Sequence, residues 1–233
     1  MPDENVNALY EIADHVSRGD TVDETLARAV RAATASVNCD ECCTYVRQDA
    51  ELVPWVWKYV QHGSLDRVSV PVGEGFAAAL AARRSPVAVS DDPSNGQAFR
   101  DFGEWSTNPG ERFVCVPFLT RSELVGVMIL HHWRPRSYSR LELKFLCTIG
   151  HLVGADLGIA SLEKENSELQ LELETSKLVE RSKGILQRDL GISEHEAYGA
   201  LQRESEQKKR PMKEIAQAII LNAEVRNSVF QTE

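Results

Sequence analysis

The spacing of apolar residues predicts two helices at the start of the chain. Over Val6–Ser17 apolar side chains recur every three or four residues, as on one face of an α-helix. A second helix begins after Thr21, which together with Glu24 has the spacing of a capping box. Its apolar stripe consists of Val22, Leu26, Ala29, Val30 and Ala33. Two amphipathic helices are therefore expected before the first strand.

Short segments rich in β-branched and aromatic residues follow, and they predict an antiparallel sheet. The predicted strands are Cys43–Arg47, Leu52–Tyr59, Val68–Val72, Val87–Ser90, Phe113–Thr120 and Leu124–His131. The last two flank a three-residue loop as a hairpin, and Phe76–Ala82 is a short helix. Strands in succession with helices at both ends indicate an α+β domain, in which helices cover one face of the sheet.

A long helix is predicted to begin at Ser139, which forms a second capping-box pattern with Glu142. Its apolar residues then follow a seven-residue repeat that predicts a parallel, dimeric coiled coil. The expected interface consists of Leu152, Ile159, Leu162, Asn166, Leu169 and Leu173, with Asn166 fixing the register. The alternative is one amphipathic helix lying on its own domain. The dimer is favoured because Glu163–Glu174 has no sheet left to cover.

Three glycines repeat at four-residue spacing in this long helix, at Gly150, Gly154 and Gly158. Each costs a helix about 1 kcal/mol relative to alanine, so a row of three indicates close packing against another backbone.

The C-terminal segment is predicted to form three helices. The first continues from the long helix and ends at Leu190 and Gly191, and the second opens with a capping box of Ser193 and Glu196. The third begins at Pro211, a residue suited to a first helical turn. The expected buried residues are Ala197, Tyr198, Leu201, Met212, Ile215, Ala216, Ile219 and Ile220.

Charge distinguishes this C-terminal segment from the rest of the chain. The protein has a net charge of −9, but residues 176–233 hold ten Lys/Arg against nine Asp/Glu. A local basic patch in this segment could therefore meet a polyanion. No apolar run is expected to span a bilayer, and no secretory signal opens the chain. Five cysteines do not suggest a disulfide framework, so the cytoplasm is the expected compartment.

The N-terminal part resembles a GAF domain over residues 20–160. The resemblance rests on the helix after Thr21, the turn Pro71–Gly75, and the segments Pro86–Asp91, Val114–Phe118 and Leu124–Leu130. It implies a small-molecule sensor or a signal-coupled dimerisation module. We expect a pocket between the sheet and the loop Asp91–Asn108, walled by Phe99, Phe102 and Trp105. The alternative is that these aromatic residues fill the cavity themselves.

The C-terminal part resembles the ANTAR domain of transcription antitermination regulators. The matching segments are Val179–Leu186, Gly191–Tyr198, Leu201–Arg203, Lys208–Arg210 and Ile215–Ala216. The pattern departs from the family at Ser182, normally Ala, and at Ser205 and Glu206, where Ala and Met are common. The resemblance implies that two copies bind stem-loops of nascent RNA and so exclude a terminator.

Together these patterns divide the chain into a GAF-like sensor at 1–160 with an N-terminal helix at 1–19, a coiled-coil linker at 161–176, an all-α ANTAR-like domain at 177–225 and a tail at 226–233. Lys and Arg neutralise phosphates, and Arg also stacks on splayed bases. The predicted RNA-binding residues are Lys183, Arg188, Arg203, Lys208, Lys209 and Arg210. Tyr198 could stack on a base, although a core position is the more common one for such a residue.

Three other functions remain open from the sequence. A cysteine-based reductase or redox sensor could use Cys39, Cys42, Cys43 or Cys115, although free cysteines are commonly buried core residues. A metal site at Cys39, Cys42 and Cys43 lacks a second ligand cluster, and His131 and His132 at a strand end are the alternative haem or metal ligands. Three short helices could also bind DNA. The expectation is a non-enzyme that binds RNA as a homodimer, with an unidentified small-molecule effector, no assigned cofactor or metal, and no membrane.

Overall fold

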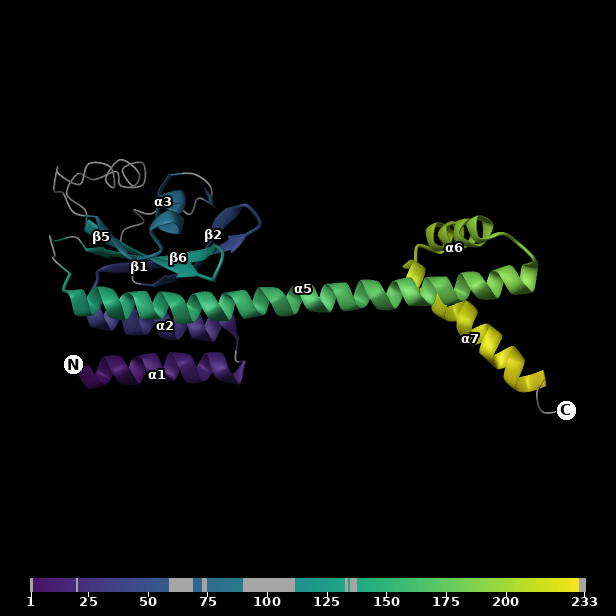
Figure 1. Ribbon diagram of the computed structural model, residues 1–233, viewed down its shortest axis with the longest axis horizontal. Helices are drawn as coiled ribbons and strands as arrows, with labels where there is room; N and C mark the ends of the chain where they lie inside the picture. Colours follow the sequence, from purple (N-terminus) through teal and green to yellow (C-terminus); the bar gives the residue numbers. More distant parts are fainter. Residues whose placement is uncertain are drawn as a thin grey trace. The chain divides into compact units, whose positions relative to one another are not determined.

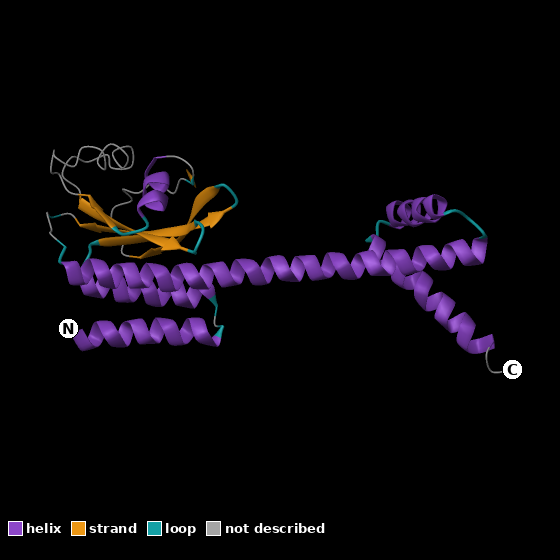
Figure 2. Ribbon diagram, in the orientation of Figure 1, coloured by secondary structure: helices purple, strands orange, loops and turns teal. Residues whose placement is uncertain are grey.

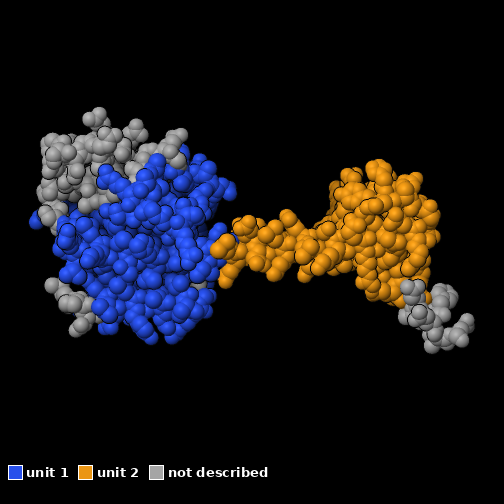
Figure 3. Space-filling model, in the orientation of Figure 1, with its two compact units in different colours: residues 1–161 blue, residues 162–233 orange. Residues whose placement is uncertain are grey.

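The computed structural model describes residues 2–19, 21–58, 69–72, 75–89, 112–132, 134 and 138–230 of the chain. The chain divides into two compact units, residues 1–161 and 162–233, which Figure 3 colours separately. The division falls inside helix α5 (Arg140–Leu190), so this helix contributes residues to both units.

The first unit opens with two helices, α1 (Pro2–Arg18) and α2 (Val22–Val37), close to their predicted positions. The predicted capping box at Thr21 is wrong, since among the described residues its side chain accepts no cap hydrogen bond. Instead the Glu24 N–H donates to the Thr21 carbonyl oxygen at 3.0 Å. The capping box at the start of α5 is confirmed. There Glu142 N–H donates to Ser139 Oγ at 3.2 Å, and Ser139 N–H donates to a Glu142 carboxylate oxygen at 2.7 Å.

Six strands form one antiparallel sheet within the described residues, in the order β3-β2-β1-β6-β5-β4. The strands are β1 (Glu41–Gln48), β2 (Glu51–Lys58), β3 (Val70–Pro71), β4 (Val87–Val89), β5 (Arg112–Leu119) and β6 (Leu124–His132). Every predicted strand is present with ends shifted by a few residues, and β5 and β6 form the predicted hairpin.

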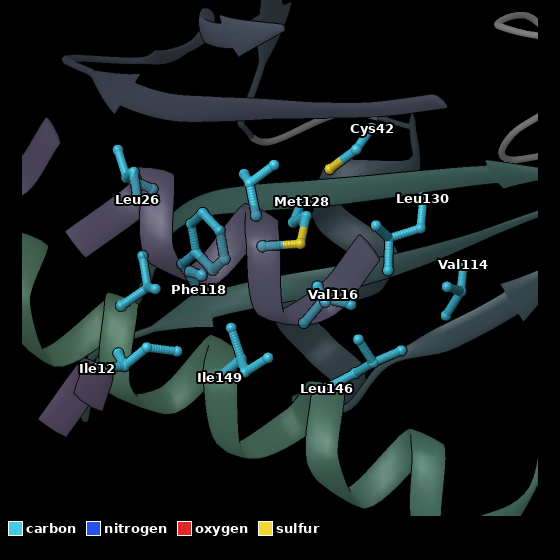
Figure 4. Packing of buried hydrophobic residues seen from close by; sticks show 14 of the residues in the cluster. Ile12, Leu26, Cys42, Val114, Val116, Phe118, Met128, Leu130, Leu146 and Ile149 are labelled. Carbon is cyan, nitrogen blue, oxygen red and sulfur yellow. The ribbon is translucent and has the colours of Figure 1, made fainter. Parts of the chain in front are cut away.

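Helices pack on both faces of the sheet, which corrects the expectation that they cover only one (Figures 1 and 2). On one face Leu26 of α2 and Leu146 and Ile149 of α5 pack with Phe118 and Met128 of the sheet (Figure 4). On the other face α3 (Gly75–Arg83) packs through two buried residues, Ala77 and Leu80. The signal for two covered faces was the continuous apolar run of β5, because a strand buried on both sides does not alternate.

The glycine row of α5 packs against the end of β5, which identifies the backbone that the sequence could not. A β-carbon on Gly150 would come within 2.5 Å of the Pro117 carbonyl oxygen. One on Gly154 would come within 2.4 Å of the Leu119 nitrogen. Real β-carbons do not approach so closely, so these positions require glycine for the helix to lie this near the strand.

Helix α5 also contains an 18-residue window with a mean hydropathy of 1.5, long and apolar enough in composition to cross a membrane. The sequence predicted no bilayer-spanning run in this helix. Half of it is buried inside the protein, as is common for the core helix of a soluble domain.

The heptad positions of α5 lie in two different environments. Phe145 is buried in the sensor core, and Leu152 packs partly buried against that core, so less of Leu152 is available to a partner than predicted. Further along, Ile159, Leu162, Leu169 and Leu173 are each about half exposed or more, at 47%, 66%, 57% and 56%. An apolar stripe is therefore left open on the second half of the predicted interface.

Candidate nucleic-acid interface

The C-terminal unit consists of the end of α5 and two helices, α6 (Glu194–Lys208) and α7 (Met212–Phe230). Their core is formed by Val179, Leu201, Ile215 and Ala216, as the sequence predicted for the last three. Helix α5 ends at Leu190, and Gly191 follows with a φ of +68°, a left-handed conformation that favours glycine. The predicted three-helix arrangement is therefore confirmed.

The N-terminus of α6 is fixed by the predicted capping box. Glu196 N–H donates to Ser193 Oγ at 3.3 Å, and Ser193 N–H donates to a Glu196 carboxylate oxygen at 2.9 Å. The hydrogen bond from the Ser193 hydroxyl, followed by the one from its N–H, lowers the pKa of the Glu196 carboxyl. The loop between α5 and α6 is thus held by both a backbone turn and a side-chain cap.

The basic turn between α6 and α7 is an ordered structure. Lys209 caps α6 in the left-handed conformation with φ 50°, and Arg210 N–H donates to the Ser205 carbonyl oxygen at 3.1 Å. The hydroxyl of Ser205 donates back to the Arg210 carbonyl oxygen at 2.6 Å. Ser205 stands where the family commonly has alanine, and here its hydroxyl stabilises the turn that carries Lys208, Lys209 and Arg210.

Lys183, one of the predicted RNA-binding residues, is largely buried. Its side chain is 9% exposed, and its ammonium donates to the carboxylates of Glu180 and Glu194, each at 2.7 Å. The hydrogen bond to Glu180, followed by that to Glu194, raises the pKa of Lys183. A phosphate would therefore compete with these two carboxylates for the ammonium.

The other predicted cations differ in whether their charge is already compensated. Ion pairs join Arg188 to Asp189 at 3.0 Å, Lys208 to Glu204 at 2.9 Å and Arg210 to Glu214 at 3.5 Å. Within the described part of the chain, Arg203 and Lys209 make no ion pair. These two residues therefore have the most freely available positive charge of the predicted set.

The six predicted residues also do not form one cluster. Lys213, just after the basic turn, bonds to Glu174 of α5 at 3.3 Å, so the turn lies beside that part of the helix. Arg188 is 14 residues further along α5, about 21 Å at 1.5 Å per residue. Arg188 and the turn therefore lie near opposite ends of the unit.

The exposed face of α6 carries an aromatic residue that the sequence analysis placed in the core. Tyr198 is 44% exposed, whereas its neighbour Ala197 is fully buried. One and two turns along the same face lie Gln202 and Glu206, joined by a hydrogen bond of 3.3 Å. The guanidinium of Arg203 folds over Gly199, where an added β-carbon would come within 3.4 Å of it. Tyr198 and Arg203 thus project from one short helix.

Helix α7 extends beyond the predicted domain end at residue 225 and into the predicted tail at 226–233. One ion pair, between Arg226 and Asp189 at 2.6 Å, ties this extension to α5, and a second, between Arg181 and Glu224 at 2.7 Å, lies just before it. Ala223, which is buried and was not among the predicted core residues, continues the apolar stripe of the helix.

The predicted pocket residues of the sensor domain, Phe99, Phe102 and Trp105, lie outside the described residues. The described α3-facing side of the sheet buries Leu52, Tyr45 and Val127. Glu41 and His131 share this side, because they alternate along their strands with Cys42 and Leu130, which pack on the other face.

The cysteines on that face are poorly suited to redox chemistry. Cys43 and Cys115 are each in register with Ile129, one on either side of its strand. Their Cα atoms are thus about 9–10 Å apart, beyond the roughly 7 Å that a disulfide spans. Burial raises the pKa of both thiols, and the charge of Glu41 raises that of Cys43 further. Both therefore remain protonated at neutral pH, whereas a nucleophile requires the thiolate.

The two histidines at the end of β6 are buried. His131 Nδ1 lies 3.5 Å from a carboxylate oxygen of buried Glu41, and His132 packs edge-on against Tyr138. Among the residues that the structure describes, no group of three or more His, Cys, Asp or Glu side chains is placed to hold a metal ion.

Comparison with known proteins agrees with this two-part architecture. The GAF domain model matches residues 21–157, and the ANTAR domain model matches residues 167–220. The ANTAR match begins inside the predicted linker at 161–176, where the continuous helix α5 offers no boundary. A 62-residue segment is 40% identical to the transcriptional regulatory protein PdtaR of Mycobacterium tuberculosis. This match covers 27% of the present chain and only 30% of PdtaR.

Solved structures similar to the chain share the fold of its sensor domain. The GAF domain of a phosphoenolpyruvate-protein phosphotransferase from Coxiella burnetii aligns with a TM-score of 0.55 and 16% identity, over 70% of this chain and 97% of that one. The free methionine-R-sulfoxide reductase of Neisseria meningitidis aligns with a TM-score of 0.51 and 16% identity, over 68% and 91%.

These similarities establish the fold, and the family matches cover both units. The GAF match alone spans more than half of the 233 residues. The chain belongs to the GAF domain family and carries an ANTAR domain after its GAF domain.

Proposed function

We propose that this protein is an RNA-binding regulator that acts as a dimer on stem-loops of nascent RNA, in the manner of a transcription antiterminator. One observation carries the proposal. In a domain of the ANTAR family, α6 and the turn after it present an exposed aromatic residue, Tyr198, together with two cations, Arg203 and Lys209. Neither cation makes an ion pair within the described residues.

The chemistry of these side chains suits a folded RNA with an open loop. Lysine and arginine release counterions when they bind phosphates, which supplies affinity without sequence preference. Bases that are unstacked in a loop can stack on tyrosine or on an arginine guanidinium. Tyr198 and Arg203 supply both kinds of surface, and Lys209 adds charge at the end of the same helix.

The exposed stripe on α5 supports a dimer. Leu162, Leu169 and Leu173 are more than half exposed and recur at heptad spacing, with Asn166 between them. A second copy of the chain would bury these leucines, and a pair of asparagines would favour a parallel register. Two copies would supply two RNA-binding faces for paired stem-loops.

The sensor domain is proposed to control this activity through a small-molecule effector. The similarity of one segment to a protein named as a transcriptional regulatory protein supports a regulatory role. A target among nascent transcripts implies a cytoplasmic protein that needs neither catalysis nor a membrane.

Sequencing the RNA that crosslinks to the purified full-length chain in cell extract tests the proposal directly. Stem-loops located upstream of terminators are the expected product. Competition between the recovered RNA and DNA of the same sequence, at one salt concentration, then separates RNA recognition from binding to any polyanion. Equal competition by the DNA, or recovery of unstructured RNA only, would contradict the proposal.

A further inference from the structure

Lys183 has a local environment unlike that of the other predicted RNA-binding cations. It is the one among them whose side chain is nine-tenths buried, and its ammonium is held by two carboxylates at 2.7 Å. Arg203, by comparison, is exposed on α6. Lys183 can remain charged at this burial because the carboxylates of both acids compensate the charge of its ammonium.

The two acids come from different helices. Glu180 lies one turn before Lys183 on α5, whereas Glu194 is the first residue of α6. The ammonium therefore bridges the end of one helix and the beginning of the next across the loop at residues 191–193. Of the two hydrogen bonds, the one to Glu194 joins the two helices, in addition to the loop and the apolar core, while the one to Glu180 holds the ammonium on α5.

The bridge also resolves an electrostatic conflict. The N-terminus of a helix carries partial positive charge, so a lysine beside the N-terminus of α6 would be repelled. Glu194 is in the first turn of α6, and its carboxylate accepts a hydrogen bond from Lys183, which lowers the pKa of that carboxyl. Removal of Glu194 would therefore leave Lys183 facing the α6 N-terminus with only Glu180 as a partner.

We propose that Lys183 is a positioning residue, which sets the angle between α5 and α6 and so orients Tyr198 and Arg203 toward RNA, rather than a residue that contacts RNA. This inference rests on the proposed RNA-binding function. It differs from that function in what it assigns to Lys183, which acts through Glu194 and leaves the phosphate contacts to exposed cations such as Arg203.

The variant Glu194→Gln separates positioning from contact because the two roles predict opposite results. If Lys183 positions α6, loss of the Glu194 charge weakens binding to a stem-loop recovered by crosslinking by about two- to fivefold, because the Glu194 side chain is 68% exposed and solvent screens its ion pair. If Lys183 contacts phosphate, the same variant releases its ammonium and removes a nearby negative charge, so binding becomes tighter. Measurements use the full-length chain at several salt concentrations.

The salt dependence provides a second readout that a phosphate contact would change. For Lys183→Met we expect weaker binding with an unchanged slope of log Kobs against log salt. The matched variant Arg203→Ala should lower the slope by about one. In the Lys183→Met background Glu194→Gln should have little further effect, since the bridge is already broken.

Tighter binding by Glu194→Gln, or a reduced slope for Lys183→Met, would overturn the positioning role while leaving the RNA-binding proposal intact. If Lys183→Met fails to fold, Glu194→Gln alone decides, because it retains the lysine. A wild-type chain that binds no recovered stem-loop would overturn the proposed function, and this inference with it.

Discussion

Gly154 of α5 lies directly against the backbone of Leu119 in β5, so that an added β-carbon would come within 2.4 Å of the Leu119 nitrogen and 2.5 Å of its oxygen. A backbone neighbour cannot move aside as a flexible side chain can. The variant Gly154→Ala must therefore separate the helix from the sheet, and we expect it to destabilise the sensor domain by about 2 kcal/mol. Chemical denaturation of the full-length chain measures this change.

Gly184 supplies the matched control in the same helix. Apart from the adjacent residues and the backbone of its own helix, no described atom lies within 4 Å of the position that its β-carbon would occupy. Gly184→Ala should therefore raise stability by about 1 kcal/mol through helix propensity alone. Equal effects at the two positions would show that helix propensity, and not contact with β5, determines the need for glycine.

The exposed leucines of α5 predict the oligomeric state. Replacing Leu162 and Leu169 with lysine places charges in the proposed interface, so the protein should become monomeric by light scattering and bind RNA more weakly. Leu171 is equally exposed at 57% but lies outside the a and d positions. Leu171→Lys should therefore leave the mass of a dimer unchanged, and a dimer that survives the double substitution would exclude this interface.

The free cations predict the salt dependence of RNA binding. Replacing Arg203 and Lys209 together with alanine should weaken binding to a recovered stem-loop and lower the salt slope by about two, one for each lost phosphate contact. Lys164→Ala, on the exposed part of α5 outside the ANTAR core, is the control and should change neither quantity. Full affinity in a folded double variant would move the RNA-binding surface away from α6.

The buried thiols predict selective alkylation. Because burial raises the pKa of Cys43 and Cys115, iodoacetamide at pH 8 should leave both unmodified in the native protein and modify them after denaturation. Partly exposed Cys147 should react earlier, although burial raises its pKa as well. Mass spectrometry of digested protein gives the order. Rapid native modification of Cys43 or Cys115 would restore the redox interpretation.

The Lys183 bridge predicts a pH dependence of stability. The pKa of Glu194 is lower in the folded state than its ordinary value, so its contribution is present above that ordinary value and is lost as pH falls through the lowered one. Thermal unfolding of Glu194→Gln should therefore lose less stability on acidification than the wild type. Parallel curves for the two proteins would mean that the bridge contributes no net stability.

Much of the fold could be predicted from the sequence because its signals are local. Gly191 ends α5, and Ser193 with Glu196 caps α6, through contacts made within a few residues. The cap at Thr21 failed even though its spacing is the same, since spacing permits a side-chain hydrogen bond without requiring it. Local sequence patterns therefore predicted where helices end more accurately than which side-chain hydrogen bonds cap them.

The candidate site was less predictable because it depends on which elements meet. Lys183 was predicted as an RNA-binding cation, and nothing in the sequence indicated that Glu194 pairs with it from another helix. Tyr198 was expected to be buried beside Ala197, but the buried face of α6 includes Ala197 and Leu201 and leaves Tyr198 partly exposed. A residue type indicates what a side chain can do, whereas its environment is set by partners distant along the chain.

The glycine row of α5 has a consequence for how a sensor signal could be read. Close contact at Gly150 and Gly154 fixes the rotation of the helix about its own axis relative to β5. On another side of the same turns Leu141, Thr148 and Ala155 face solvent at seven-residue spacing, and Leu162 continues this series. A shift of β5 within the sheet would therefore rotate or translate this row of residues. A partner helix packed against the row would then pair with it in a different register.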